Sequence, residues 1–126
     1  REEINKMKSI FNFQSHSVSH PILTQCDSKK SKIEIHKSRK DLQSKFDLDI
    51  FAFAFPNGNF SKREISFVQS AGYRCALNTI NGFNSKDSNL FYLKRISAGT
   101  GTSLNETIFK SSGLWIKMKN LFHFLR

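Results

Sequence analysis

The stretch DLDIFAFAFPNGNF, residues 47–60, carries the clearest strand signal in the sequence. Its run of Phe and Ala between Ile50 and Phe55 predicts a strand, because aromatic residues are enriched in strands and the run is too short for a helix. Pro56, Asn57 and Gly58 follow as a turn signal that ends it. What flanks this strand on each side decides the fold class.

Helical patterns flank the strand on both sides. Residues 27–46 are rich in charge and place apolar side chains on one helical face (Ile35, Leu42 and Phe46), with Asp27 or Ser28 as the N-cap. Ser61 and Glu64 form a capping box, which opens a second helix that turns its apolar residues inward (Ile65 and Val68).

After the second helix, further predicted strands follow. Gly72 is well placed to end the second helix, YRCALNTI at 73–80 predicts a strand, and LFYLKRIS at 90–97 predicts a further extended segment. Strands that alternate with helices in this order are parallel and are joined by right-handed crossovers. The sequence therefore predicts an α/β fold, in which chemistry collects at the carboxyl ends of the strands.

The C-terminal residues 98–126 form a separate helical pattern. Ser103 and Glu106 make another capping box, and the helix is expected to run to about Phe122 with a break at Gly113. Its mixture of aromatic and basic residues could lie on an anionic membrane surface. A terminal helix that packs on the rest of the fold is the favoured interpretation.

The N-terminal residues lead into a histidine pair. Ile4, Met7 and Phe11 have helical spacing, residues 11–14 alternate as a short strand would, and SHSVSHP follows at 15–21. The chain has no initiator Met and starts inside a helical pattern. We therefore expect it to be part of a longer protein that carries further sequence before it.

The composition limits the classes of protein to which the chain can belong. With 126 residues and thirteen Phe, the chain can build one domain with a real core. No apolar run approaches the roughly 20 residues of a membrane span. Cys26 and Cys75 are too few for a disulfide framework, although they could pair in an oxidising compartment. The net charge of +10 favours polyanionic partners, but interspersed acidic residues make an indifferent basic surface the favoured interpretation.

His16 and His20 are four residues apart, with Pro21 directly behind them. Proline argues against a continuing helix, so the pair belongs to a turn after a strand, where two imidazoles can still converge on one ion. A zinc site needs a third protein ligand. The spacing alone leaves two possibilities open, a metal-ligand pair or exposed polar side chains without a site.

An ordered set of motifs resembles the polysaccharide deacetylase family (NodB-homology, carbohydrate esterase 4). Residues 15–21 match its His-Ser/Thr-x-x-His motif, with Gln14 where glycine is common, and FAFPNG at 53–58 is similar to its F-A-Y-P-x-G motif. AGY at 71–73 and LKRI at 93–96 resemble two later motifs. The intervening helix fits the family at Glu34, Ile35 and Ser38. The resemblance covers roughly residues 1–97.

The resemblance implies a fold and a chemistry. Residues 1–97 would be the later part of a distorted (β/α) barrel of NodB type, and 98–126 a helical extension that packs on it. His16 and His20 would bind a divalent metal, expected to be zinc, together with an Asp, and a second Asp would be the general base. The backbone N–H of Asn57 would be the oxyanion donor.

It also implies a substrate and a location. The substrate would be an N-acetylated polysaccharide, such as a chitin-like polymer or peptidoglycan, which loses acetate in a hydrolytic step. Phe55, Pro56 and Leu93 would contact it, with Leu93 a candidate for the family's leucine and histidine pocket, to which His123 is not assigned. The family resemblance further suggests a secreted or cell-envelope protein and no nucleic-acid partner.

The sequence departs from the family pattern in three places. Both aspartates belong to a T-F-D-D type motif upstream of the histidines, and no Asp precedes His16 here. Ala54 stands where many members have an arginine that orients the catalytic Asp, and Asn57 replaces the usual Tyr. We expect this chain alone to bind metal weakly and to have little activity, with a missing N-terminal segment as its partner.

Two other hypotheses follow from these departures and from the charge. The first is a non-catalytic carbohydrate-binding relic of the same fold, which binds glycan without metal. The second is a basic nucleic-acid-binding module, which the charge alone suggests and which no aromatic-interleaved platform supports.

Overall fold

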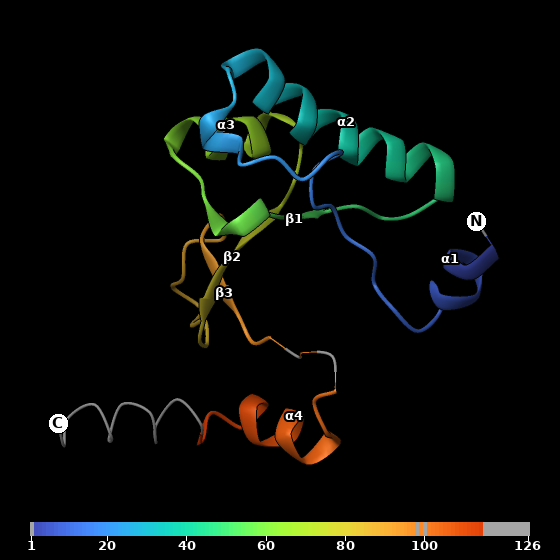
Figure 1. Ribbon diagram of the computed structural model, residues 1–126, viewed down its shortest axis with the longest axis vertical. Coiled ribbons are helices and arrows are strands. Elements are labelled where there is room, and N and C mark those ends of the chain that lie inside the picture. Colours follow the sequence, from blue (N-terminus) through green and yellow to red (C-terminus); the bar gives the residue numbers. More distant parts are fainter. Residues whose placement is uncertain (1, 98, 100, 115–126) are drawn as a thin grey trace, which may run out of the picture.

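The computed structural model describes residues 2–97, 99 and 101–114. Helices and strands alternate from α2 to β2, as the sequence predicts, whereas β2 and β3 follow each other without a helix between them (Figure 1). The elements are α1 (Glu2–Met7), η1 (Leu23–Gln25), α2 (Ser28–Phe46), β1 (Ala52–Ala54), η2 (Pro56–Gly58), α3 (Lys62–Ser70), β2 (Cys75–Asn81), β3 (Leu93–Arg95) and α4 (Leu104–Ser111).

The three strands form one parallel sheet in the order β1-β2-β3. Ala52 pairs with Cys75, and Leu77 pairs with both Ala54 and Leu93. The predicted α/β class with parallel strands is therefore confirmed, and the arrangement is consistent with part of a barrel.

The predicted strand at 11–14 is wrong, since the segment makes only an isolated parallel bridge through the next residue, Ser15, to Phe53. Ser15 N donates to Ala52 O at 3.2 Å, and Ala54 N donates to Ser15 O at 2.9 Å. The reason lies in Gln14, whose side-chain Oε1 accepts from Phe51 N (2.9 Å) and Ala52 N (2.8 Å). The Gln14 side chain thus accepts from backbone N–H groups that would otherwise donate to the backbone of a strand at 11–14.

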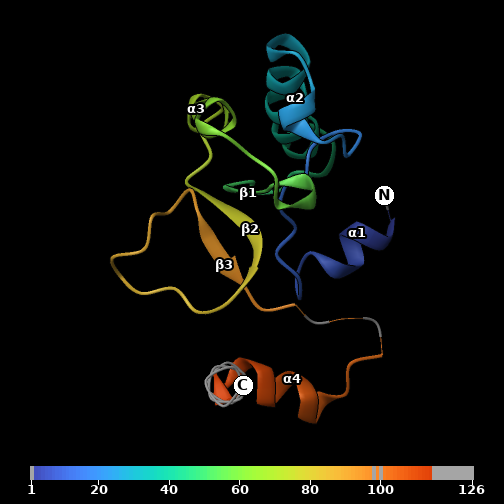
Figure 2. The ribbon, with the colours of Figure 1, turned by 60° about the vertical axis from the view of Figure 1, so that its left-hand side comes forward.

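Helices α2 and α3 lie on the same face of the sheet (Figures 1 and 2). The core lies between them and the strands, where the Phe53 ring packs edge-on against Phe55 and Tyr73 with centroids 5.3 Å apart in each case. The buried apolar side chains of this core are Leu23, Ile35, Ile50, Phe53, Phe55, Val68, Tyr73 and Ala76.

The predicted helix ends are confirmed in detail. Asp27 caps α2 by accepting from Lys30 N at 2.8 Å. Ser61 and Glu64 form the complete capping box of α3, and Gly72 follows that helix with a φ of 83° that favours glycine. These local signals depend on neighbours in sequence, which is why they could be found without the structure.

The two terminal helices contribute little to this core. Neither α1 nor α4 has a buried residue, and Figures 1 and 2 place α4 well away from α2 and α3, while α1 lies below the C-terminal end of α2. Ser103 caps α4 by accepting from Glu106 N at 3.2 Å. The predicted continuation to Phe122, and His123, lie outside the described residues, so the division at residue 97 stays a prediction.

No helix in the described ranges is long and apolar enough to cross a membrane. Cys26 and Cys75 are both free thiols.

Candidate active site

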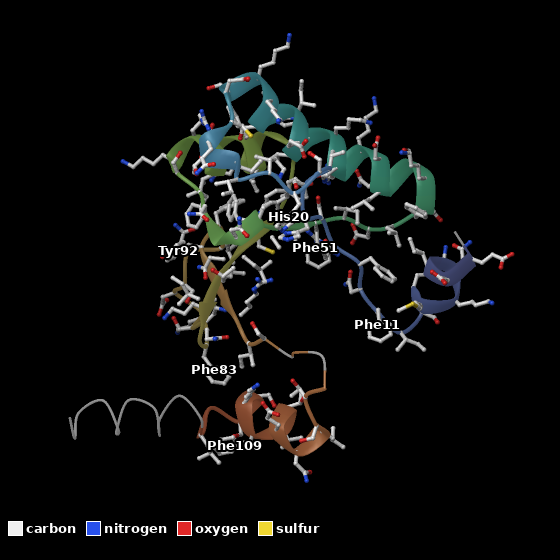
Figure 3. The ribbon with its side chains drawn as sticks, viewed as in Figure 1. Phe11, His20, Phe51, Phe83, Tyr92 and Phe109 are labelled. Carbon is white, nitrogen blue, oxygen red and sulfur yellow. The ribbon has the colours of Figure 1, made fainter. Side chains whose placement is uncertain are left out.

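Two turns meet at the carboxyl edge of the sheet. The chain leaves the bridge at Ser15 directly into His16, and it leaves β1 into the turn of η2 that carries Asn57. Since Ser15 and β1 run parallel, both exits lie at the same edge. In Figure 3 the His20 side chain lies at the centre of the view, next to β1.

His16 is held by the backbone of β1. Its Nδ1 lies 2.8 Å from the carbonyl oxygen of Ala54, at the end of the strand. A carbonyl oxygen can only accept, so Nδ1 carries the proton in the neutral ring and Nε2 keeps its lone pair. This is the hydrogen-bonding arrangement that orients metal-ligating histidines.

The second histidine is brought back to the first by a tight loop. The rings of His16 and His20 are 4.7 Å apart between centroids, at an angle of 67°. Ser17 and His20 both have left-handed backbones, with φ of 66° and 56°, and Ser17 Oγ accepts from His20 N at 3.0 Å. The loop therefore places two imidazoles side by side on one surface.

A buried carboxylate on α2 supports this loop from behind. Glu34 Oε2 accepts from Val18 N at 2.8 Å and from Ser19 N at 2.9 Å, and Oε1 accepts from Ser19 Oγ at 2.6 Å. Burial alone would raise the pKa of Glu34, but the hydrogen bonds from Ser19 and Val18 outweigh it and hold that pKa below 4.5. Glu34 is charged and bonded to the loop between the two histidines.

A chain of buried hydroxyls fixes the beginning of the loop. Ser15 Oγ lies 2.7 Å from Ser38 Oγ, which in turn lies 3.2 Å from Tyr73 Oη. Ser38 Oγ and Tyr73 Oη both donate to the carbonyl of Ile35, at 2.9 and 3.1 Å. Burial raises the pKa of Tyr73, so this hydroxyl keeps its proton over the neutral range.

The remaining predicted site residues occupy the turn after β1 and the far strand. Asn57 is exposed with a left-handed φ of 54°. Phe55 and Pro56 are buried, and the Phe55 ring stacks on Phe60 at 4.5 Å. Leu93 is half-buried on β3, opposite Leu77. The side chains of Phe55 and Pro56 thus anchor the turn to the core, and a substrate contact at these positions would involve the backbone.

The histidine pair supplies two ligands but not a full set. Two imidazoles on one surface, one of which uses its Nδ1–H to bond the carbonyl of Ala54, fit two positions of a zinc site. Within residues 2–97, 99 and 101–114, no group of three or more His, Cys, Asp or Glu side chains could hold a metal ion. The third ligand therefore has no candidate in the described part of the chain.

Sequence reasoning found the histidines but missed their supports. The sequence indicates Glu34 and Ser38 only as positions that fit the helix of the family, yet both are buried and both bind the histidine segment. Their spacing of four residues on α2, which puts them on one helical face, is the signal that could have indicated a shared polar contact.

Comparisons with known proteins concern the sequence family and the fold. The sequence profile described as polysaccharide deacetylase matches residues 1–76. Among solved structures, the deacetylase PplD of Streptococcus pyogenes, determined in complex with acetate, is similar with a TM-score of 0.76 and 24% identity over 86% of this chain and 49% of its own. A polysaccharide deacetylase of Bacillus cereus has a TM-score of 0.72 and 23% identity over 86% of this chain and 35% of its own.

The chain thus spans half or less of the length of these structures. No curated protein matches it. At such identities the structural likeness concerns the fold.

Proposed function

Because the chain belongs to the polysaccharide deacetylase family, we propose that it carries the histidine part of a metal-dependent site that removes N-acetyl groups from a polysaccharide. One observation carries the proposal. The hydrogen bond from His16 Nδ1 to Ala54 O leaves Nε2 as the ligand atom, in a ring that lies 4.7 Å from that of His20.

His16 and His20 would hold the metal, with zinc as the expected ion. When bound, a divalent cation supplies Lewis acidity toward water and toward the acyl oxygen. The third ligand and the general base are expected from the Asp-Asp motif of the family, which is found N-terminal to the histidines. The described chain alone is accordingly proposed to bind metal weakly and to be weakly active or inactive.

The turn after β1 would contribute the oxyanion donor. Asn57 is exposed and has a left-handed backbone, directly after the buried Phe55 and Pro56. A backbone N–H fixed in this way can stabilise negative charge on the acyl oxygen without reorganising during the reaction.

The substrate is proposed to be an N-acetylated polymer such as a chitin-like glycan or peptidoglycan, which places the working protein outside the cytoplasm or in the cell envelope.

Acetate release from chitin oligosaccharides tests the activity. It should be measured for the chain alone and for a polypeptide in which an Asp-Asp segment of the family precedes it, each with His16→Ala, His20→Ala and, as a control, His36→Ala. His36 lies on α2 against Ser70 and outside the histidine loop. The longer polypeptide should release acetate, and only the first two substitutions should abolish it. An unchanged rate in His16→Ala and His20→Ala would disprove the metal role.

A second candidate function is metal-independent glycan binding. It is favoured by the pair of ligands without a third in the described residues and by Ala54 and Asn57, which depart from the catalytic pattern. Binding of chitin oligosaccharides to the chain should then persist in the presence of EDTA and in His16→Ala.

A further inference from the structure

We propose that Glu34 is a positioning residue for the metal site, acting through the loop that separates the two histidines. The inference rests on the proposed metal role of His16 and His20. Glu34 itself touches neither ring; it bonds Val18 and Ser19, which lie between them in the sequence.

The contacts of Glu34 are concentrated on one short segment. Both of its carboxylate oxygens are used, for two backbone N–H groups and one hydroxyl, at distances of 2.6 to 2.9 Å. Charge-assisted bonds of this kind are short and strong compared with neutral ones. The side chain is 8% exposed, so these bonds are shielded from competing water.

The loop needs such support because its backbone is unfavourable. Ser17 and His20 adopt left-handed conformations that residues other than glycine rarely adopt. Conformations of this kind persist where the surroundings hold them, and they are concentrated at functional sites. Glu34 bonds the two residues, Val18 and Ser19, that lie between these left-handed positions.

The loop is thus held at three points from two different elements. The carbonyl oxygen of Ala54 on β1 bonds the His16 ring, and Ser38 on α2 bonds Ser15. Glu34 on α2 bonds Val18 and Ser19 in the middle of the loop. The first two contacts fix His16 alone. The position of His20 relative to His16 depends on the middle of the loop, where Ser17 Oγ accepts from His20 N and Glu34 holds Val18 and Ser19. Glu34 therefore contributes to the distance between the two ligands.

The first test measures the amide hydrogen exchange of the loop in the absence of metal. Amide exchange of Val18 and Ser19 should be at least tenfold faster in Glu34→Ala than in the unsubstituted chain, while the amide of core residue Val68 keeps its rate. In Glu34→Gln the amide oxygen can still accept from both N–H groups, so most of the protection should remain. Unchanged exchange at Val18 and Ser19 in Glu34→Ala, or an equal loss at Val68, would overturn the proposal.

The second test measures Zn²⁺ affinity by following the imidazole NMR signals of His16 and His20. Glu34→Ala should weaken Zn²⁺ binding about tenfold, the lower end of the range for residues that support metal ligands, and Glu34→Gln should restore most of it. Asp41→Asn is the control for charge, since Asp41 lies on the same helix near the loop but pairs with Lys37 and Lys45. It should leave the affinity within twofold.

The outcomes separate the two proposals. If the unsubstituted chain and its His16→Ala and His20→Ala variants respond identically to Zn²⁺, the metal role fails, and Glu34 loses its function as a positioning residue even where the exchange result holds. If the unsubstituted chain binds Zn²⁺ and Glu34→Ala binds it equally well, the positioning role alone is wrong. Should Glu34→Ala not fold, Ser19→Ala removes only the 2.6 Å contact and should weaken binding by a smaller factor.

Discussion

Replacing Glu64 with alanine should destabilise the protein more than any ordinary surface substitution. Glu64 is fully buried at the start of α3, where its carboxylate accepts from Ser61 N (3.0 Å), Ser61 Oγ (2.6 Å) and Ser31 Oγ (3.1 Å). It also pairs with Arg63 Nε at 2.7 Å. The substitution removes half of a capping box and leaves the buried Ser31 hydroxyl without this acceptor.

The magnitude follows from those contacts. Loss of a helix cap costs about 1 kcal/mol, and a buried hydroxyl left without its partner costs about 1–3 kcal/mol. The Arg63 side chain is 32% exposed, so the ion pair adds only a few tenths of a kcal/mol after solvent screening. The expected loss is about 2–4 kcal/mol, or a fall in Tm of roughly 8–16 °C for a domain of this size.

The effect should also depend on pH. Burial acts to raise the pKa of Glu64, but the bonds from Ser61 and Arg63 outweigh it, so the folded pKa lies below the ordinary value of 4.5. A carboxyl with a lowered folded pKa stabilises the protein above its unfolded pKa, and this contribution is lost as the pH falls through the folded pKa. The difference in stability between the unsubstituted chain and Glu64→Gln should therefore be largest near neutrality and shrink below pH 4.5.

Urea unfolding at pH 7 and at pH 3.5, followed by circular dichroism, measures both effects. The control is Glu106→Ala, which removes an acidic residue at the same position of the capped helix α4, where the side chain is 49% exposed and pairs with Lys110. That control should change stability by less than about 0.5 kcal/mol. A loss below 1 kcal/mol for Glu64→Ala would refute the assignment of Glu64 as a buried support of α3.

Two further predictions concern the site edge. Nitrogen-15 NMR of the metal-free chain at neutral pH should show His16 protonated at Nδ1 and not at Nε2; the opposite tautomer would contradict the bond to Ala54 O. Gly58→Ala should destabilise the protein by about 2–3 kcal/mol, because an added Cβ would collide with the Thr79 side chain at a left-handed φ of 74°. Thr79→Ala should recover part of that loss, and its failure to do so would locate the cost in the backbone alone.

The fold class could be predicted because its signals are local. The Phe and Ala strand, the capping box at Ser61 and the glycine at position 72 each depend on a few neighbouring residues, and all three occur as predicted. The strand at 11–14 could not be excluded in this way. Its absence depends on the Gln14 side chain, which bonds the backbone at Phe51, 37 residues away.

The candidate site likewise has one part that the sequence predicts and one part that it does not. The positions of His16 and Asn57 after parallel chain segments follow from topology, which the alternation of helices and strands reveals. The residues that support the histidine loop do not follow from the topology. Glu34 lies on a charged helix where a carboxylate is normally solvated, and only the folded arrangement brings it to the amide groups of Val18 and Ser19.

Position 54 shows why a departure from a family pattern need not remove a whole site. Many family members are expected to have an arginine here that orients the catalytic Asp, and Ala54 cannot do so. The contact that position 54 makes with His16, however, uses the backbone carbonyl, which is the same for every residue type. Under the proposed function, the alanine would therefore affect the base and not the ligand, so a polypeptide with the Asp-Asp segment should bind metal normally even where its deacetylation rate is low. Ala54→Arg in that polypeptide should raise the rate of acetate release and leave Zn²⁺ affinity unchanged. A parallel change in both would show that position 54 acts on the histidines as well.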